Sequence, residues 1–185
     1  MNKKIILLIL SDIFILSSFG LIAPIFAVFI KDNLIGGSLV TAGLATTIFL
    51  TVKSILQLPL AWYIDKHKHK ITLLVLGTLL IITIPFIYIF AKTIYGIFIA
   101  QAIYGVGAAL AYPCWFSLFI KYIDKKHRGF EYALWSTGIG VGTALAAYLG
   151  AEIANDLGFN FLFLIVGFFA FLGFLLLLLL SKYEK

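Results

Sequence analysis

The chain alternates long apolar runs with short polar segments. Six runs are long enough to cross the hydrocarbon core of a bilayer, which is about 30 Å thick and takes roughly 20 residues of helix. Backbone groups in lipid find no partners outside their own segment, and the runs are too long for the strands of about 9–11 residues in a membrane barrel. The pattern therefore predicts an all-α membrane protein with a single six-helix transmembrane domain over residues 1–185. The expected spans are residues 5–30, 39–63, 71–91, 94–120, 132–154 and 159–180.

Composition agrees with this pattern and excludes other classes of protein. The mean hydropathy is +1.11, and only 12% of residues are charged, whereas a soluble domain carries about 25%. The net charge of +6 comes from cations at the ends of apolar runs, where lipid headgroups lie, so we expect a lipid bilayer and no nucleic acid as partner. Cys114 is the single cysteine, which excludes an intramolecular disulfide and a cysteine-based metal site. We expect no cofactor.

Lysine and arginine are distributed unequally between the two sides of the predicted topology. Short loops rich in these residues mark the cytoplasmic side of a membrane protein. Lys31 and Lys92 fall on one side, Lys53 lies within a span, and the remaining eleven cations fall on the other side. We therefore expect a single orientation with both termini in the cytoplasm. The eleven are Lys3, Lys4, Lys66, Lys68, Lys70, Lys121, Lys125, Lys126, Arg128, Lys182 and Lys185.

Four polar side chains inside the spans are our candidates for a substrate or ion pathway: Asp12, Lys53, Gln57 and Gln101. A charge at mid-membrane costs at least ~2.5 kcal/mol on insertion scales, so such charges are expected to serve a function. Asp12 and Lys53 lie on adjacent antiparallel spans at a similar depth, and we expect them to face one polar cavity. The alternative is that Lys53 extends towards the cytoplasm and that Asp12 only neutralises it.

Small residues form a seam along the fifth span. Gly138, Gly142, Ala146 and Gly150 recur every four residues and therefore share one helix face. Small residues at this spacing let two membrane helices approach closely. The seam either packs inside the six-helix unit or meets a helix outside it, and we expect it to supply a close-packing surface towards a second six-helix half.

Two spans share a weak internal similarity. Gly20–Pro24 in the first span resembles Gly107–Pro113 in the fourth, and these spans cross in opposite directions, as an inverted three-plus-three repeat requires. Each span with a proline is expected to be kinked, either to shape a cavity or only to aid packing. The four prolines are Pro24, Pro59, Pro85 and Pro113.

Several degenerate motifs occur in order on these spans. Ala61-x-x-x-Asp65-Lys66 is followed by basic residues up to Lys70, and Arg128-Gly129 follows the fourth span. Gln101-Ala-Ile-Tyr-Gly-Val-Gly107 lies in the fourth span, and Gly138-x-x-x-Gly142-Thr143-x-x-Ala146-Ala147 in the fifth. Together they resemble the amino-terminal six-helix half of a major facilitator superfamily (MFS) transporter, with Asp65, Lys66, Lys70 and Arg128 in the loops that control its conformation.

The resemblance implies a secondary transporter and also limits what it transports. Members have about twelve spans, with substrate bound between two six-helix halves. Gln101 stands where drug–proton antiporters carry an arginine, and Thr143 replaces the proline of the antiporter motif, so we do not assign proton-driven drug export. We expect a multi-pass protein of the bacterial cytoplasmic (inner) membrane.

These observations predict a half-size transporter subunit. It would move a small solute by alternating access and assemble with a second six-helix half, either a second copy or a separate chain. The alternative is a non-transporting membrane protein: a decayed or truncated MFS fragment, or an assembly factor. We do not expect an enzyme, because no G-x-S-x-G or H-E-x-x-H motif and no paired intramembrane carboxylates are present.

Overall fold

The computed structural model describes residues 2–67 and 69–184 of the chain. Within these residues, six helical segments are long and apolar enough to cross a membrane, which confirms the predicted number of spans. The first span is built from three pieces, and each of the other five is one continuous helix. The elements are α1 (Lys3–Gly20), the 3-10 turn η1 (Ala23–Ile25), α2 (Phe26–Asn33), α3 (Leu39–Lys66), α4 (Lys70–Phe90), α5 (Ile94–Tyr122), α6 (Arg128–Leu157) and α7 (Phe159–Glu184).

Pro24 coincides with the break in the first span. A proline has no backbone N–H to donate and its ring crowds the preceding turn, so an α-helix rarely continues through it. Here α1 ends at Gly20, Pro24 lies in η1, and α2 restarts at Phe26. Pro59, Pro85 and Pro113 lie within uninterrupted helices. Of the four prolines, only Pro24 therefore divides its span into separate helices.

Short links with defined hydrogen bonds connect the spans. Ser38 caps α3 through a capping box. Its Oγ accepts from the Thr41 N–H, and Oγ1 of Thr41 accepts from the Ser38 N–H. Ile35 accepts from the Ile94 N–H and donates to the Lys92 carbonyl, which ties together the two links at this end of the bundle. At the α6–α7 link, Gly158 takes a φ of +82°, a conformation that side chains with a Cβ rarely adopt.

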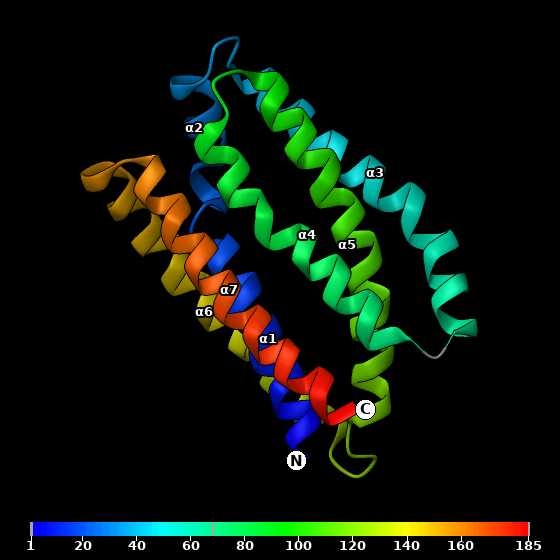
Figure 1. Cartoon of the computed structure of the whole chain (residues 1–185). Coiled ribbons are helices and arrows are strands. Elements are labelled where there is room, and N and C mark those ends of the chain that lie inside the picture. The colour runs from blue at the N-terminus through cyan, green and yellow to red at the C-terminus, as the bar shows by residue number, and fades with distance from the viewer. Residues whose placement is uncertain (1, 68, 185) are drawn as a thin grey trace.

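The helices pack as two groups of three. In one group α1 lies against α6 and α7, in the other α5 lies against α3 and α4, and the contact between α4 and α7 joins the groups (Figure 1). The α4–α5 crossing is close because it is made at glycines: a Cβ on Gly77 would lie 2.7 Å from the Gly107 carbonyl oxygen. Contacts between α1 and α5 are sparse, and this leaves room for the polar site described below.

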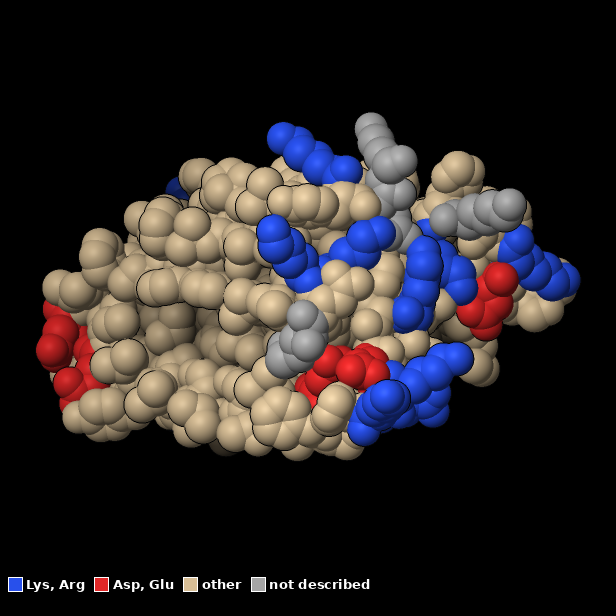
Figure 2. All heavy atoms as spheres, turned by 90° about the horizontal axis from the view of Figure 1, so that it is seen from below, with Lys and Arg blue, Asp and Glu red and all other residues tan. Residues whose placement is uncertain are grey.

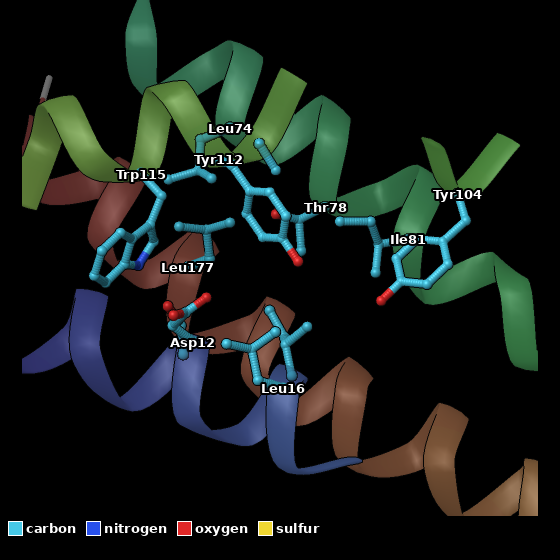
Figure 3. Close-up of a pocket in the computed structure, with 12 residues that line it drawn as sticks. Asp12, Leu16, Leu74, Thr78, Ile81, Tyr104, Tyr112, Trp115 and Leu177 are labelled. Atoms are coloured by element: carbon cyan, nitrogen blue, oxygen red, sulfur yellow. The ribbon is translucent and has the colours of Figure 1, made fainter. Parts of the chain in front are cut away.

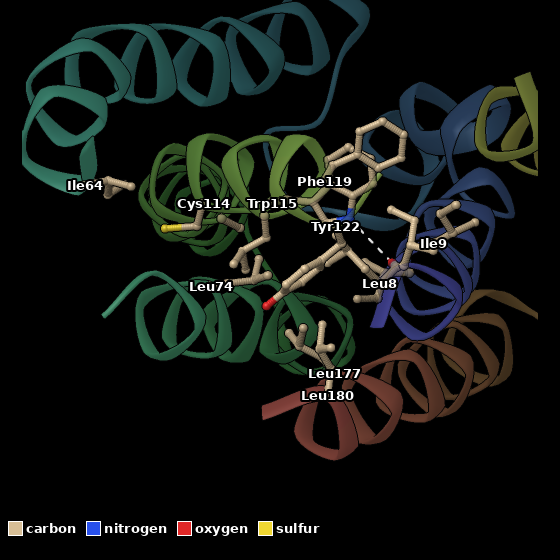
Figure 4. Packing of buried hydrophobic residues seen from close by; sticks show 14 of the residues in the cluster. Leu8, Ile9, Ile64, Leu74, Cys114, Trp115, Phe119, Tyr122, Leu177 and Leu180 are labelled. Atoms are coloured by element: carbon tan, nitrogen blue, oxygen red, sulfur yellow. Dashed lines mark hydrogen bonds between the residues drawn. The ribbon is translucent and has the colours of Figure 1, made fainter. Parts of the chain in front are cut away.

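A hydrophobic core closes the bundle at the end that holds both termini. Trp115 and Phe119 of α5 reach across to Leu8 and Ile9 of α1, with Leu177 of α7 beside them (Figure 4). The indole N–H of Trp115 points at the Leu8 carbonyl, 3.5 Å away. Lys and Arg side chains gather on the same end face (Figure 2).

Two helices remain largely unburied. In the most apolar stretch of α3 and of α6, 11% of residues are buried, against 39% to 44% in the other four spans. The shared feature is that α3 and α6 are each the middle span of a set of three along the chain. Most of the surface of α3 and α6 is therefore not covered by the described part of the chain.

Candidate functional site

Asp12 lies at a small cavity between the two helix groups. The cavity has a volume of about 20 Å³, enough for one water molecule. Thr78 of α4 and the hydroxyls of Tyr104 and Tyr112 on α5 line it opposite Asp12 (Figure 3). The remaining wall is mostly aliphatic, with Leu177 of α7 among its residues. This inner pocket therefore places one carboxylate among hydroxyl groups in otherwise apolar surroundings, where it can hold a cationic group, a proton or a water molecule.

Trp135 of α6 holds the Asp12 carboxylate in place. Its indole N–H donates to Oδ2 of Asp12 at 2.8 Å. The Trp135 ring packs against that of Trp115 with centroids 4.8 Å apart, so the donor is fixed from α5 as well. An indole N–H can only donate, which suits a carboxylate acceptor. Asp12 is thus supported by a helix that begins more than a hundred residues later in the sequence.

Lys53 reaches the same region from α3 but does not touch Asp12. Its ammonium group lies 4.4 Å from the centroid of the Tyr112 ring and 5.9 Å from that of Phe49. Between the described residues Asp12 and Lys53 there is no ion pair within 4 Å. The Tyr112 ring is instead the group that both approach, because it lines the inner pocket and lies beneath the Lys53 ammonium.

Gln101 faces a second cavity nearer the opposite end of the bundle. This outer pocket has a volume of about 240 Å³. Gln101 is buried and donates through Nε2 to the hydroxyl of Tyr88 at 3.2 Å. No Asp, Glu, Lys or Arg lines this pocket among the residues that the structure describes, and its walls are largely aromatic, with Phe26 and Phe49 among them. The outer pocket is therefore suited to an apolar or aromatic group with a hydrogen-bonding function.

The four polar residues predicted from the sequence thus occupy different places. Asp12 lies in the inner pocket, Gln101 in the outer pocket, and Lys53 on the Tyr112 ring. Gln57 is half-buried on α3 and lines neither pocket. The two pockets share one residue, Tyr104, and the described residues do not form a single site that contains all four predicted side chains.

The basic loop after α3 is organised around Lys70. Its ammonium group donates to Oγ of Ser117 at 2.6 Å and lies 3.6 Å from Oδ1 of Asp65. Lys66 covers the ring of Trp62, with Nζ 3.3 Å from the centroid. Asp65 and Lys66 belong to the last turn of α3 and Lys70 begins α4, so the connection is shorter than the sequence pattern indicated. Asp65, Lys70 and Ser117, which we call the Lys70 group, link the ends of three helices.

Arg128 lies elsewhere. It was expected in a loop outside a span beginning at residue 132, but α6 begins at Arg128 itself. Helix α6 extends further because Glu131, one turn in, folds back and accepts the backbone N–H of Asp124 at 3.1 Å. Arg128 is exposed and makes no ion pair with a described residue of the Lys70 group.

Glu131 is the most deeply buried charged side chain at this end, with 1% of its surface exposed. Its Oε2 closes the α5–α6 link, while Oε1 is buried and has no hydrogen-bond partner among the described residues. Within the link, the carboxylate of Asp124 accepts from the Lys126 N–H and from the His127 ring. Those two hydrogen bonds hold the pKa of Asp124 below its ordinary value of 3.8.

The small-residue seam of α6 packs inside the chain, so the expectation that it contacts a second six-helix half is wrong. A Cβ on Gly142 would meet Oγ of Ser17, and one on Gly150 would meet the backbone carbonyl of Leu21, both in the first span. By contrast, Gly140 on α6 and Gly43 on α3 have nothing within 4 Å of an added Cβ. The faces open to a helix from outside are therefore those of Gly140 and Gly43.

Sequence reasoning missed several residues of this site: Trp135, Tyr104, Tyr112, Tyr88 and Glu131. Aromatic residues are ordinary in membrane helices, so nothing in a single sequence distinguishes those that face a cavity. Glu131 lies just before the expected fifth span and reads as an exposed loop residue. The observed helix begins four residues before the expected span, at Arg128, and this places Glu131 in its first turn.

The chain is similar in sequence to known transporters. The Major Facilitator Superfamily model matches residues 8–185. The multi-drug resistance efflux pump PmrA of Streptococcus pneumoniae is 28% identical over 170 residues, which is 90% of this chain and 42% of the pump. An uncharacterized MFS-type transporter of Methanocaldococcus jannaschii is 24% identical over 154 residues, covering 83% of this chain and 39% of that protein.

The fold is also that of solved transporters. The POT family transporter PepTSo superimposes with a TM-score of 0.84 at 16% identity, over 98% of this chain and 38% of its own. An auto-inhibited POT family peptide transporter gives a TM-score of 0.81 at 18% identity, over 98% of this chain and 37% of the transporter chain. At these identities the likeness shows the fold alone. The chain spans about two fifths of the length of each relative.

Sequence and fold agree, and they agree with the resemblance carried by the degenerate motifs. The protein is an integral multi-pass membrane protein of a transporter family and not an enzyme. With a family match over nearly its whole length, the chain belongs to the Major Facilitator Superfamily.

Proposed function

We propose that this six-helix chain forms one half of a secondary transporter that moves a small solute by alternating access. The observation that carries the proposal is the open surface of α3 and α6, of which so little is buried within the chain. Neither pocket reaches the roughly 300–1,000 Å³ of a site that encloses a drug-sized ligand. A second six-helix half placed against α3 and α6 would cover these helices and complete the site.

The packing supports an inverted three-plus-three repeat within the half. If the first three spans exchange with the last three, α1 corresponds to α5, α3 to α6 and α4 to α7. The contacts of α1 with α6 and α7 then correspond to those of α5 with α3 and α4, and the α4–α7 contact maps onto itself. Such repeats are common in transporters, where the site lies near the bilayer midplane at their interface.

The charge distribution supports one orientation and a parallel assembly. Cations gather at the end that holds both termini (Figure 2), which favours the cytoplasmic side of a bacterial inner membrane. Two halves inserted the same way up can be related by an axis along the membrane normal, as MFS halves are. The second half would then be either another copy of this chain or a different six-helix segment.

The Lys70 group gives this half a contact that can differ between conformations. Lys70 joins the ends of α3, α4 and α5 through Asp65 and Ser117. A shift of α3, the helix expected to meet the other half, would break the Asp65–Lys70 ion pair. We therefore assign Asp65, Lys66 and Lys70 to the balance between conformations and Asp12, Lys53 and Gln101 to the solute pathway.

Assembly tests the proposal directly. The open positions Gly43 and Gly140 allow a leucine to be added without a clash inside the chain. Gly43→Leu and Gly140→Leu should release the second half in mild detergent, as measured by native mass and cross-linking. Gly129→Leu is the matched control, because Gly129 is equally open but lies at the end of α6.

Transport decides the outcome, with a fluorescent dye such as ethidium as the probe because one relative is a multi-drug resistance efflux pump. The assembled protein should export the dye from vesicles, and the two leucine variants should not. A lone six-helix monomer that transports would contradict the proposal. A lone monomer that neither assembles nor transports would favour the non-transporting alternative.

A further inference from the structure

The inner and outer pockets meet at one side chain. Tyr104 is the only residue that lines both among those the structure describes. Its hydroxyl points towards the cavity opposite Asp12 (Figure 3), while its ring borders the outer pocket. Tyr104 is therefore the described residue at which the two cavities adjoin.

Three helices hold the Tyr104 ring in place. The ring is stacked on that of Phe19 of α1 with centroids 5.1 Å apart, and it packs in a tilted arrangement against the ring of Phe49 of α3 at 4.5 Å. The α3–α5 crossing is close here because the next residue is Gly105, whose added Cβ would lie 2.9 Å from the Phe49 carbonyl oxygen. Phe19, Tyr104 and Phe49 thus form a continuous aromatic layer across the half, which we call the aromatic partition.

The chemistry differs on the two sides of the partition. The inner pocket carries the Asp12 carboxylate and two tyrosine hydroxyls, whereas the outer pocket offers the Gln101 amide, Tyr88 and aromatic walls without a charged side chain among the described residues. A tyrosine with its hydroxyl on the polar side and its ring on the aromatic side matches both environments.

We propose that Tyr104 separates two ligand stations in series, an outer one for apolar or aromatic groups and an inner one for polar or cationic groups, and that rotation of its ring opens the passage between them. The inference deepens the proposed transport function by naming the residue that controls access to Asp12. It concerns one half alone and does not depend on the nature of the second half.

Thiol labelling of the purified chain tests the partition. Cys114, the single cysteine, is first replaced by alanine to give a background without thiols. Thr46→Cys then reports on the outer pocket, and Thr78→Cys, buried at 3% exposure, reports on the inner pocket. A charged, water-soluble methanethiosulfonate should modify Cys at position 46 about tenfold faster than Cys at position 78, since access to the inner pocket needs local opening.

Replacing the ring should remove the difference. Tyr104→Ala should raise the labelling rate of Thr78→Cys about tenfold while leaving that of Thr46→Cys unchanged. Tyr104→Phe keeps the ring and should leave both rates unchanged, and Tyr95→Ala, at an exposed tyrosine of the same helix, is the matched control. Equal rates for the two cysteines with Tyr104 present would overturn the proposal. So would a Thr78→Cys rate that Tyr104→Ala does not change.

Labelling also separates this inference from the proposed transport function. The rates are measured on the isolated six-helix chain, and a control for folding is the unchanged rate of Thr46→Cys. A failed dye-export assay with the expected labelling pattern would reject transport and keep the partition. Successful transport with equal labelling rates would reject the partition and keep the transport function.

Discussion

At the scale of single residues, the site depends on how one partly buried carboxylate is stabilised. A charge in an apolar interior is costly unless it is hydrogen-bonded or paired. Asp12 obtains its hydrogen bond from Trp135 rather than an ion pair from Lys53. Lys53 in turn is stabilised by the faces of Tyr112 and Phe49. Coupling between Asp12 and Lys53 stays a prediction, and we expect it to act through Tyr112.

The Trp135–Asp12 hydrogen bond should be measurable as a coupling energy. Trp135→Phe keeps the ring packing against Trp115 but leaves the partly buried carboxylate without its donor, which should cost about 1–3 kcal/mol of stability. In an Asp12→Ala background the same change should cost less, since no carboxylate remains. A double-mutant cycle from unfolding in detergent gives the coupling. Trp62→Phe, on the exposed side of α3, should show none; coupling of similar size at Trp62 would mean that the effect is not this bond.

At the scale of elements, glycines decide which helix faces can approach each other. The seam of α6 packs against the first span because a Cβ on Gly150 or Gly142 would collide with it. Gly77 and Gly107 do the same for α4 and α5. In lipid, helix association depends on such close packing, because apolar side chains gain little by leaving lipid for protein. The open glycines, Gly43 of α3 and Gly140 of α6, meet no neighbour in the described chain, so their faces are available to a helix from outside it.

Two alanine substitutions on α6 should therefore differ in their effect on the stability of the protein. Gly150→Ala places a methyl group against the Leu21 backbone carbonyl, and we expect it to destabilise the protein by about 1–3 kcal/mol. Gly140→Ala meets nothing within 4 Å and should be neutral or stabilising by up to about 1 kcal/mol, because alanine favours the helix over glycine. Thermal unfolding in mild detergent compares them. Equal effects at the two positions would show that the seam does not pack against the first span.

At the scale of the whole molecule, charge and apolar surface serve different purposes. The cations at one end favour that end as the cytoplasmic side, and the uncovered faces of α3 and α6 are where we propose that another six-helix half packs. The relatives are more than twice as long as this chain, and the sites proposed here are the share that one half contributes.

Topology is the prediction that belongs to this scale. A reporter fused after Lys185 should be cytoplasmic, and a tag inserted within Asp32–Gly37 should be accessible from outside the cell. The expectation rests on eleven cations on one side of the topology predicted from the sequence against two on the other. Protease protection of tagged cells is the measurement. A mixed population, or a reporter on the outside, would reject the orientation and with it the parallel assembly.

The sequence by itself determined the features that depend on neighbouring residues. The length and apolarity of each run required six spanning helices, since lipid offers no other way to satisfy the backbone. Motif order indicated the transporter family, and the four-residue spacing of Gly138, Gly142, Ala146 and Gly150 identified a close-packing face.

Tertiary structure decided everything that depends on which distant residues meet. It turned the seam towards α1, gave Asp12 a partner 123 residues away, and put Gln101 in a separate pocket from Asp12. Helical periodicity says which residues share a face but not which helix that face meets, and helix packing settles the second question through contacts between segments far apart in the chain. For the same reason, Tyr104 is an unremarked aromatic residue in the sequence and the boundary between two cavities in the fold.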